Sequence, residues 1–230
     1  MRKRIPKITL FAMALAGILF ACQHDFDEPD DSRSLTVAGA KAWYEAHKPD
    51  YIGLKSGSME SKVKYLKPDW ENAGKFENEK LEAVETGLMS QGGWGFATEE
   101  SYREWESSGT FGYIASVSKL VVLRNKENNE LVSFVMTISG DKTYLEKNKF
   151  DVRKNNYLQK DKDFSGFVFF HNLEGKFVNG WRFTDGKATH RAQLDFDYGF
   201  GLKLKSVSCH SESVYGWYQD CTFWYQSNNV

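Results

Sequence analysis

The C-terminal part of the chain holds the densest group of residues that could recognise a ligand. Six aromatic residues fall between positions 215 and 225, interspersed with polar amide and carboxyl side chains. Aromatic rings can stack on the apolar faces of sugars while polar neighbours bond the hydroxyls. The alternative is that the rings fill the core, since burial is the usual fate of large rings. The candidate ligand-binding residues, for a glycan or an extracellular protein, are Trp217, Tyr218, Trp224 and Tyr225.

Residues 161–166 could supply oxygen ligands to a cation. Asp161, Asp163 and Ser165 alternate along the chain before a glycine, as in the first half of a calcium-binding loop. The twelfth position is Asn172 rather than a bidentate acid, and the residues before it read as a strand. We therefore expect no metal site. Calcium is the weaker alternative to a polar turn that enters the strand.

Two of the three cysteines, Cys209 and Cys221, lie near the C-terminus, and they form a pair when Cys22, discussed below, is set aside. An even number of cysteines in a secreted chain favours a disulfide. Closing so short a loop would stabilise the fold by about 3 kcal/mol on the chain-entropy argument. Two free buried thiols are the alternative. A metal site is less favoured, because neither cysteine lies in a C-x-x-C motif and His210 is a single neighbouring imidazole.

Most of the sequence patterns that indicate a catalytic site are absent. No histidine lies in an H-E-x-x-H motif, and no serine lies in a G-x-S-x-G motif. The run GWRFTDGK at residues 180–187 departs from the spacing of a phosphate-binding loop and reads as a hairpin. We expect no catalytic residues and no cofactor, and favour a non-enzymatic binding or accessory role. A secreted hydrolase of extracellular polymer and an inhibitor-like accessory protein are the alternatives.

The first part of the folded region is expected to mix helices and loops. Ser34 can cap an amphipathic helix over residues 35–48. Residues 50–78 are polar and rich in Gly, Ser and Lys, which indicates an extended arm. The glycine-rich residues 91–96 are expected to form a loop, and residues 98–105 a short helix.

From residue 113 onward the sequence pattern becomes that of β-structure. Asp185-Gly186 favours a tight turn, since Asp-Gly readily adopts positive φ. Other apolar runs pair across polar reversals, at 120–123 with 131–138 and at 167–170 with 177–183. Consecutive hairpins indicate an antiparallel meander of about six to eight strands rather than βαβ units. We therefore predict an α+β fold, mainly an antiparallel β meander with an N-terminal helix packed on it.

The N-terminal segment has the pattern of a secretory signal peptide. Residues 1–7 carry four cations and no acid, and residues 8–21 are uncharged and mostly apolar. This is a basic region followed by an apolar region of secretory length. A helix that crosses a bilayer needs about 20 residues, so the apolar run is too short to span comfortably. Residues 1–21 are therefore predicted to be a signal peptide.

The end of this segment reads Leu19-Phe20-Ala21-Cys22 and resembles the lipobox of bacterial lipoproteins. In that family the cysteine is lipidated and becomes the mature N-terminus. A thiol is the nucleophile that can carry a diacylglyceryl group. The resemblance therefore implies that Cys22 is lipidated and attaches the chain to a membrane. The alternative is an ordinary signal peptide that happens to precede a cysteine.

The run QHDFDEPDD after Cys22 is rich in acidic residues. It is similar to the acidic export signal of surface lipoproteins in Bacteroidota-type Gram-negative bacteria. The resemblance implies an outer-membrane lipoprotein displayed at the cell surface, or otherwise facing the periplasm. Such a charged run is also expected to be disordered. We therefore expect residues 22–34 to form a lipidated tether and residues 35–230 a single α+β domain.

The run FSGFVFFHNLEGKFVNGWRFTDGK at residues 164–187 resembles secreted domains of unassigned function found in such bacteria. This resemblance is consistent with the β meander and implies no activity.

The formal net charge of -1 over 230 residues conceals two opposite segments. The cationic signal segment and the acidic tether nearly cancel, so the folded part is close to neutral. A balanced domain gives no electrostatic basis for capturing nucleic acid. The expected partners are a membrane, through the lipid anchor, and a glycan or extracellular protein.

Overall fold

The computed structural model describes residues 34–49, 66–90, 93–192, 194–195, 202–205 and 211–219. Its larger sheet has eight strands: β1 (Leu66–Pro68), β2 (Gly74–Glu77), β3 (Leu81–Ser90), β5 (Val117–Asn125), β6 (Leu131–Gly140), β7 (Gly166–His171), β8 (Phe177–Thr184) and β9 (Lys187–Ala192). The smaller sheet has four: β4 (Gly93–Thr98), β10 (Leu194–Asp195), β11 (Leu202–Lys205) and β12 (Ser211–Gln219). The helices are α2 (Val37–His47), α3 (Glu99–Ser108) and α4 (Lys142–Lys147), with 3-10 turns η1 (Trp70–Asn72) and η2 (Phe111–Ile114).

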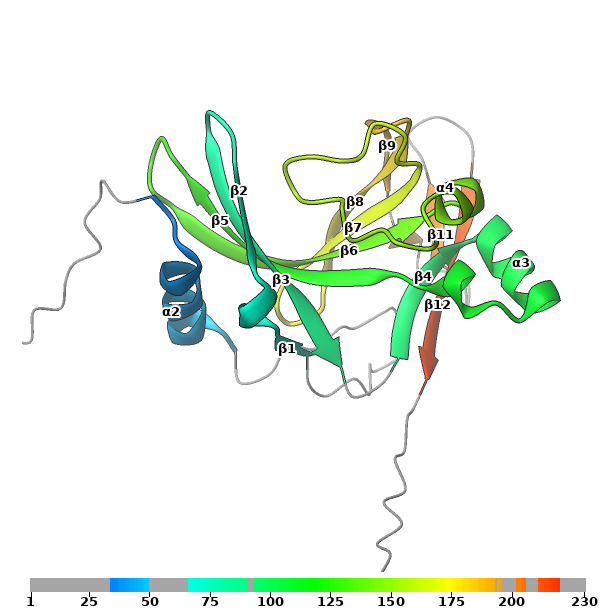
Figure 1. The fold of residues 1–230 in the computed structure, drawn as a ribbon, viewed down its shortest axis with the longest axis horizontal. Helices are drawn as coiled ribbons and strands as arrows, with labels where there is room; N and C mark the ends of the chain where they lie inside the picture. The colour runs from blue at the N-terminus through cyan, green and yellow to red at the C-terminus, as the bar shows by residue number, and fades with distance from the viewer. Residues whose placement is uncertain are drawn as a thin grey trace, which may run out of the picture. The chain divides into compact units, whose positions relative to one another are not determined.

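The large sheet is the antiparallel meander that the sequence predicts. Strands β3, β5, β6, β7, β8 and β9 follow one another across the sheet, and each pairs antiparallel with the next (Figure 1). The β8–β9 turn contains Asp185 and Gly186, both with positive φ (48° and 71°), as the Asp-Gly pattern predicts. With its few helices, the chain has the predicted α+β fold.

Helix α2 lies close to its predicted position, but a different residue caps it. Thr36, rather than Ser34, is the N-cap, and its hydroxyl accepts a hydrogen bond from the Gly39 N–H at 3.0 Å. Ala40 and Tyr44, which are four residues apart and so share one face of the helix, are buried. They pack on the large sheet in a cluster with Val84, Leu120, Val122 and Val135. The predicted packing of the N-terminal helix on the sheet is therefore confirmed.

The glycine-rich segment predicted as a loop is in fact largely a strand. Residues 93–98 form β4, which pairs antiparallel with β12. Phe96 of this strand is 3% exposed and packs on Phe167 and Phe169 of the large sheet. Glycines disfavour a strand locally, but pairing with a segment far along the chain overrides that preference. The prediction of a short helix after this segment is confirmed by α3, which Thr98 caps.

Residues 50–78 also contain more structure than the predicted arm. Strand β1 pairs with one half of the outer edge of β3, and β2 pairs with the other half. Both strands are short, which weakens their sequence signal.

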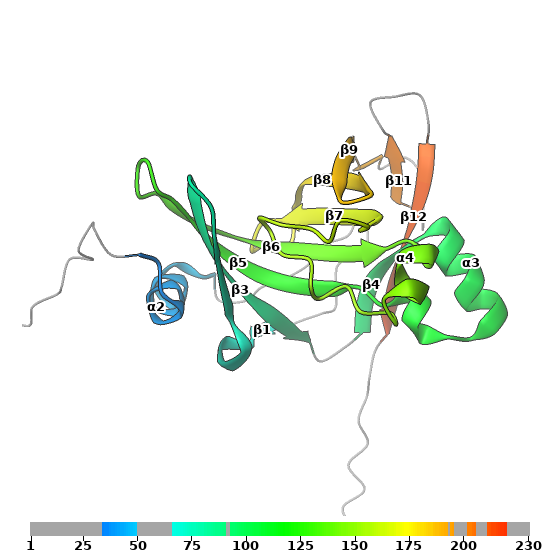
Figure 2. The same cartoon turned by 45° about the horizontal axis from the view of Figure 1, so that its top comes forward.

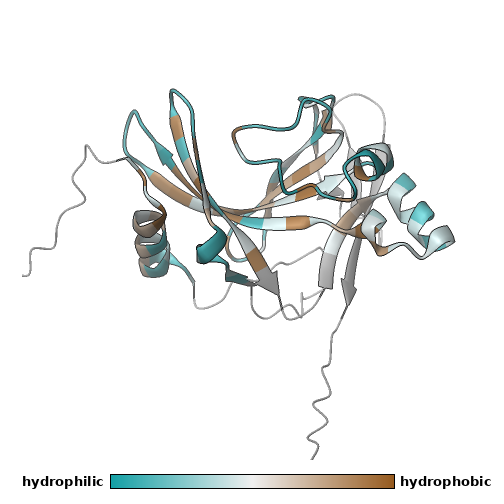
Figure 3. Cartoon of the chain, viewed as in Figure 1, coloured by the Kyte–Doolittle hydropathy of each residue, from teal (hydrophilic) through white to brown (hydrophobic). Residues whose placement is uncertain are grey.

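Alternate residues of the meander face opposite sides of the large sheet, and each side has its own apolar core. One side includes Ala83, Val121, Met136 and Val168. The other side packs on α2 and, farther along, on β4. Figure 3 shows hydrophobic stretches along the central strands and hydrophilic colour at several loops and turns.

Helices α3 and α4 lie beside each other near β4 and β12 (Figure 2). An ion pair joins them, with Lys142 Nζ 2.6 Å from Glu104 Oε2. Within the described ranges, no helix combines the length and apolar character needed to cross a bilayer.

Candidate binding groove

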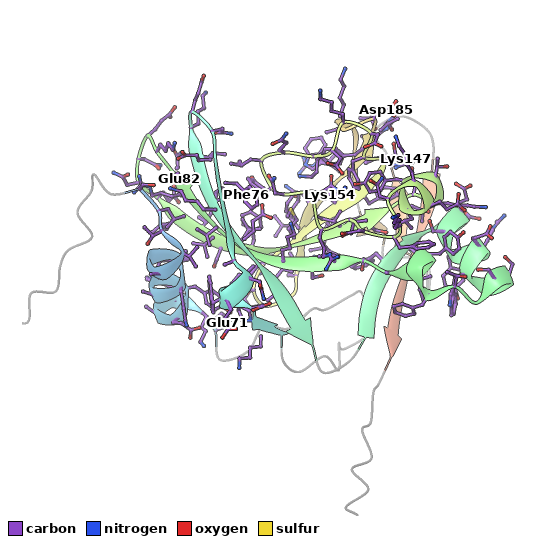
Figure 4. All side chains as sticks on the ribbon, in the orientation of Figure 1. Glu71, Phe76, Glu82, Lys147, Lys154 and Asp185 are labelled. Carbon is purple, nitrogen blue, oxygen red and sulfur yellow. The ribbon has the colours of Figure 1, made fainter. Side chains whose placement is uncertain are left out.

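A segment that contains neither helix nor strand, residues 148–165, covers part of one face of the large sheet. We call it the cover loop, and Figure 4 labels one of its residues, Lys154. Val152 and Phe164 of the cover loop are 1% and 0% exposed, and both belong to the apolar cluster on that face. The cover loop is therefore a packed layer over the strands.

A buried ion pair fastens the cover loop to the sheet. Glu85 of β3 and Lys119 of β5 lie side by side, with Lys119 Nζ 3.1 Å from Glu85 Oε2. The same ammonium donates to the main-chain oxygens of Arg153 (3.0 Å) and Asn155 (2.7 Å). The other carboxylate oxygen of Glu85 accepts from the Tyr157 N–H. Two sheet residues thus bind the main chain of the cover loop at three alternate residues, 153, 155 and 157.

A second network fixes the cover loop to itself and to Tyr144 of α4. Asn155 is fully buried, and its amide donates to Tyr144 Oη at 2.9 Å and to the Val152 carbonyl at 3.1 Å. Tyr144 Oη donates to Asp161 Oδ2 at 2.7 Å, while the Asp161 N–H donates to Asn155 Oδ1 at 2.9 Å. Burial, with the hydrogen bond to Asp161, raises the pKa of the Tyr144 phenol. These bonds set the position of the residues between Asn155 and Asp161.

An open groove of about 500 Å³ lies between the cover loop and the strands. Aromatic side chains dominate its wall: Phe134, Tyr157, Phe170, Trp181 and Phe183. The rings of Tyr157, Phe134 and Phe170 contact one another, with centroids 5.2 to 5.8 Å apart. We call this site the aromatic groove. Its apolar, concave wall is typical of small-molecule binding sites.

Two residues of β8 expose large apolar side chains to solvent at the aromatic groove. Val178 is 57% exposed and Trp181 is 37% exposed, although both are large hydrophobic residues. A cluster of exposed apolar side chains beside a cavity marks an interaction site more often than scattered ones do. A bound ligand would remove this surface from water.

Besides the Tyr157 hydroxyl, two polar side chains line the aromatic groove in the described part of the chain. Lys160 of the cover loop donates to the carbonyls of Asn156 and Tyr157, and its ammonium lies 5.4 Å from the centroid of the Phe183 ring. Burial lowers the pKa of Lys160 to about 8, since it disfavours the charged form. The side-chain oxygen of Asn179 is buried and has no hydrogen-bond partner in the described part of the chain.

The structure describes only two of the four aromatic residues near the C-terminus that the sequence predicts to bind a ligand. Trp217 and Tyr218 lie in β12, where the main chain pairs with Gly95 and Trp94 of β4. Only the backbone of these two residues is described. Trp224 and Tyr225 lie outside the described residues. Their role as ligand-binding residues stays a prediction.

The cysteines on which the lipid anchor and the disulfide depend also lie outside the described residues. These are Cys22, Cys209 and Cys221. Lipidation and the disulfide therefore stay predictions.

The three oxygen-bearing residues of the calcium alternative face different partners. Asp161 accepts from Tyr144, as described above, whereas Asp163 Oδ2 lies 2.5 Å from Lys147 Nζ. Ser165 Oγ accepts from the Asp185 N–H at 3.1 Å. Figure 4 labels two of these partners, Lys147 and Asp185. Within the described ranges, no three His, Cys, Asp or Glu residues are grouped so that they could hold a metal ion.

The residues of the aromatic groove were not singled out from the sequence. They come from five strands (β3, β6, β7, β8 and β9) and the cover loop, and most of them read as ordinary strand or turn residues. One sequence signal was available. Val178, Asn179 and Trp181 fall in a run with aromatic residues on both sides, which predicts a strand but does not show which face the cover loop leaves open.

Comparison with protein-family models, with curated proteins and with solved structures found no match to this chain.

Proposed function

We propose that this protein is an exported, lipid-anchored binding protein whose aromatic groove takes up a small apolar ligand. The observation that carries the proposal is the exposure of Val178 and Trp181 at the rim of an apolar groove of about 500 Å³. Burial of apolar surface gives about 25 cal/mol per Å², so a ligand that covers these side chains gains binding energy directly. The fixed cover loop supports the proposal, since a preorganised wall lowers the entropic cost of binding.

The groove has the composition of a binding site rather than of a catalytic one. Among the described residues, its polar side-chain groups are the Lys160 ammonium, the Asn179 amide and the Tyr157 hydroxyl, against a wall of five aromatic rings. Aromatic walls of this kind suit flat or elongated apolar molecules. We therefore assign the groove a ligand-binding role.

The proposal is tested with N-phenyl-1-naphthylamine, an uncharged dye that fluoresces in apolar surroundings. We expect the protein to bind it with a 1:1 stoichiometry, and Trp181→Ala to weaken binding about tenfold or more, because a tenfold change needs only about 1.4 kcal/mol. Phe111→Ala is the matched control, since Phe111 is 52% exposed and does not line the groove. Absence of saturable dye binding, or equal weakening by both variants, would reject the proposal.

The cellular setting proposed for this activity is the outer membrane, with display at the cell surface. The lipobox-like LFAC sequence at residues 19–22 and the acidic run after it support this setting. Stable anchoring by acyl chains requires more than one chain, which diacylglyceryl modification of Cys22 would supply. A disulfide between Cys209 and Cys221 is proposed as a further consequence of export, because the export route is oxidising.

The anchor is tested by replacing the cysteine that would carry the lipid. We expect Cys22→Ser to release the mature protein from the membrane fraction, because serine cannot form the thioether. Fractionation of cells that express the natural and the variant chain measures this. Undiminished retention of the variant in the membrane would contradict the proposed anchor. It would not bear on the proposal that the groove binds a ligand.

A further inference from the structure

We infer that the ligand of the aromatic groove is an amphiphile with an apolar body and one anionic head, and that Lys160 binds the head. This inference rests on the proposed function, because it names the ligand class for the same groove. It is carried by the charge of Lys160 and by the third N–H donor of its ammonium, which has no acceptor among the described residues.

Among the residues that the structure describes, only two acceptors face the Lys160 ammonium. A lysine ammonium has three N–H donors, and two of them are used by the main-chain oxygens of Asn156 and Tyr157. Its centre also lies over the Phe183 ring, which favours a cation but does not neutralise it. An anion in the groove can therefore accept the third hydrogen bond.

The charge of Lys160 is not compensated by an ion pair within the part of the chain that the structure describes. The carboxylate that acts on it electrostatically is Glu85, which attracts it, while Lys119 repels it. Both Glu85 oxygens are already engaged, one with Lys119 and the other with the Tyr157 N–H. A partly buried cation without a counter-ion is costly, so an anionic ligand would stabilise it.

The uncharged part of the ligand is specified by the rest of the groove. The rings of Tyr157, Phe183 and Trp181 suit an apolar body. The Asn179 side-chain oxygen, buried and without a partner among the described residues, could accept from one N–H or O–H donor on that body. The groove therefore fits an apolar carboxylate or sulfonate better than a hydrocarbon.

The test compares two dyes that share a ring system and differ in charge. One is N-phenyl-1-naphthylamine, and the other is 8-anilinonaphthalene-1-sulfonate, which adds a sulfonate. We expect the protein to prefer the sulfonate, and Lys160→Met to change the ratio of the two dissociation constants at least about tenfold against the sulfonate. Lys160→Arg should restore most of the preference, because it keeps the charge.

The matched control is Lys162→Met, which removes an exposed charge two residues away in the same cover loop and outside the groove lining. It should leave the ratio within about twofold, since an exposed charge is screened by solvent. Cooperative thermal unfolding of every variant confirms that the dyes report on folded protein.

The pH dependence provides a readout that a merely structural role would not produce. The sulfonate stays ionised, so its affinity should fall as pH rises through about 8, where Lys160 loses its proton. The charged groups that act on Lys160 are Glu85 and Lys119. Burial raises the pKa of the Tyr157 phenol, which favours its uncharged form. Lys160→Arg should remove this decline.

The outcomes separate the inference from the proposed function. If neither dye binds, the proposed function fails and the inference fails with it. If the uncharged dye binds and Lys160→Met leaves the ratio of dissociation constants unchanged, the groove binds apolar molecules but Lys160 does not select an anion, and the inference alone is overturned. A ratio that Lys162→Met changes as strongly as Lys160→Met would also overturn the inference.

Discussion

Replacement of Lys119 by methionine is expected to destabilise the protein by about 3–5 kcal/mol, because it leaves the Glu85 carboxylate buried without its counter-ion. Glu85 is 3% exposed and Lys119 is 9% exposed, so solvent cannot substitute for the lost partner. The change also removes the donor that holds the carbonyls of Arg153 and Asn155. Urea unfolding followed by circular dichroism measures the free energy of unfolding.

The matched control makes the same substitution on the opposite face of the sheet. Lys75 lies 3.1 Å from Glu82, but Glu82 keeps Arg124 at 2.8 Å and the Leu35 N–H at 3.1 Å. The Lys75 side chain is also 31% exposed. Lys75→Met should therefore cost about 1 kcal/mol or less. A cost for Lys119→Met no larger than that of Lys75→Met would show that the pair does not hold the cover loop.

A double variant separates the pair from the loop contacts. Lys119→Met with Glu85→Gln should cost less than the sum of the two single changes, since each single variant leaves one unpaired buried charge and the double variant leaves none. We also expect Lys119→Met to weaken binding of the uncharged dye. Release of the cover loop would move Tyr157 and Lys160, which form one wall of the groove. The buried pair thus links stability to function.

Acidification is expected to destabilise the fold through His171, by about 3 kcal/mol between pH 6.5 and pH 4. This side chain is 4% exposed, stacks on Phe96 and meets the edge of Phe177. Burial lowers the pKa of His171 to about 4, against about 6.5 in an unfolded chain. As the pH falls, the unfolded state therefore binds the proton before the folded state does. The contribution of neutral His171 to the free energy of unfolding is fully present above pH 6.5 and declines as pH falls toward 4.

The histidine contribution is isolated by comparing unfolding free energies of the natural chain and His171→Phe from pH 4 to pH 7. The ring of phenylalanine suits the aromatic cluster and cannot be protonated, so the variant should lose much less stability on acidification. His190→Gln, which alters a histidine that is not buried, serves as the control. Parallel pH profiles for the natural chain and His171→Phe would contradict the assignment.

The hairpins were predictable because their signals are local. The Asp185-Gly186 turn and the polar reversal between β5 and β6 are specified by residues adjacent in sequence. Strand β4 was not predictable, because its glycines oppose a strand and its partner β12 lies far along the chain. The N-cap differed by two residues because Ser34 and Thr36 are both good caps, and the choice depends on tertiary packing.

The groove could not be predicted for a different physical reason. Its position depends on where the cover loop stops covering the sheet, which the Glu85–Lys119 pair and the Asn155 network decide. The sequence pattern of residues 161–166 predicts a turn or a cation loop and gives no indication of a role for Lys160. The chemistry of a buried lysine appears only when the strands beneath it are in place.

A crystal structure of the protein soaked with 8-anilinonaphthalene-1-sulfonate would show whether the groove between the cover loop and strands β6 to β9 binds an apolar ligand. We expect electron density for the rings between Tyr157 and Trp181, with the sulfonate within hydrogen-bond distance of Lys160 Nζ. Dye density elsewhere on the protein, with the aromatic groove empty, would contradict it.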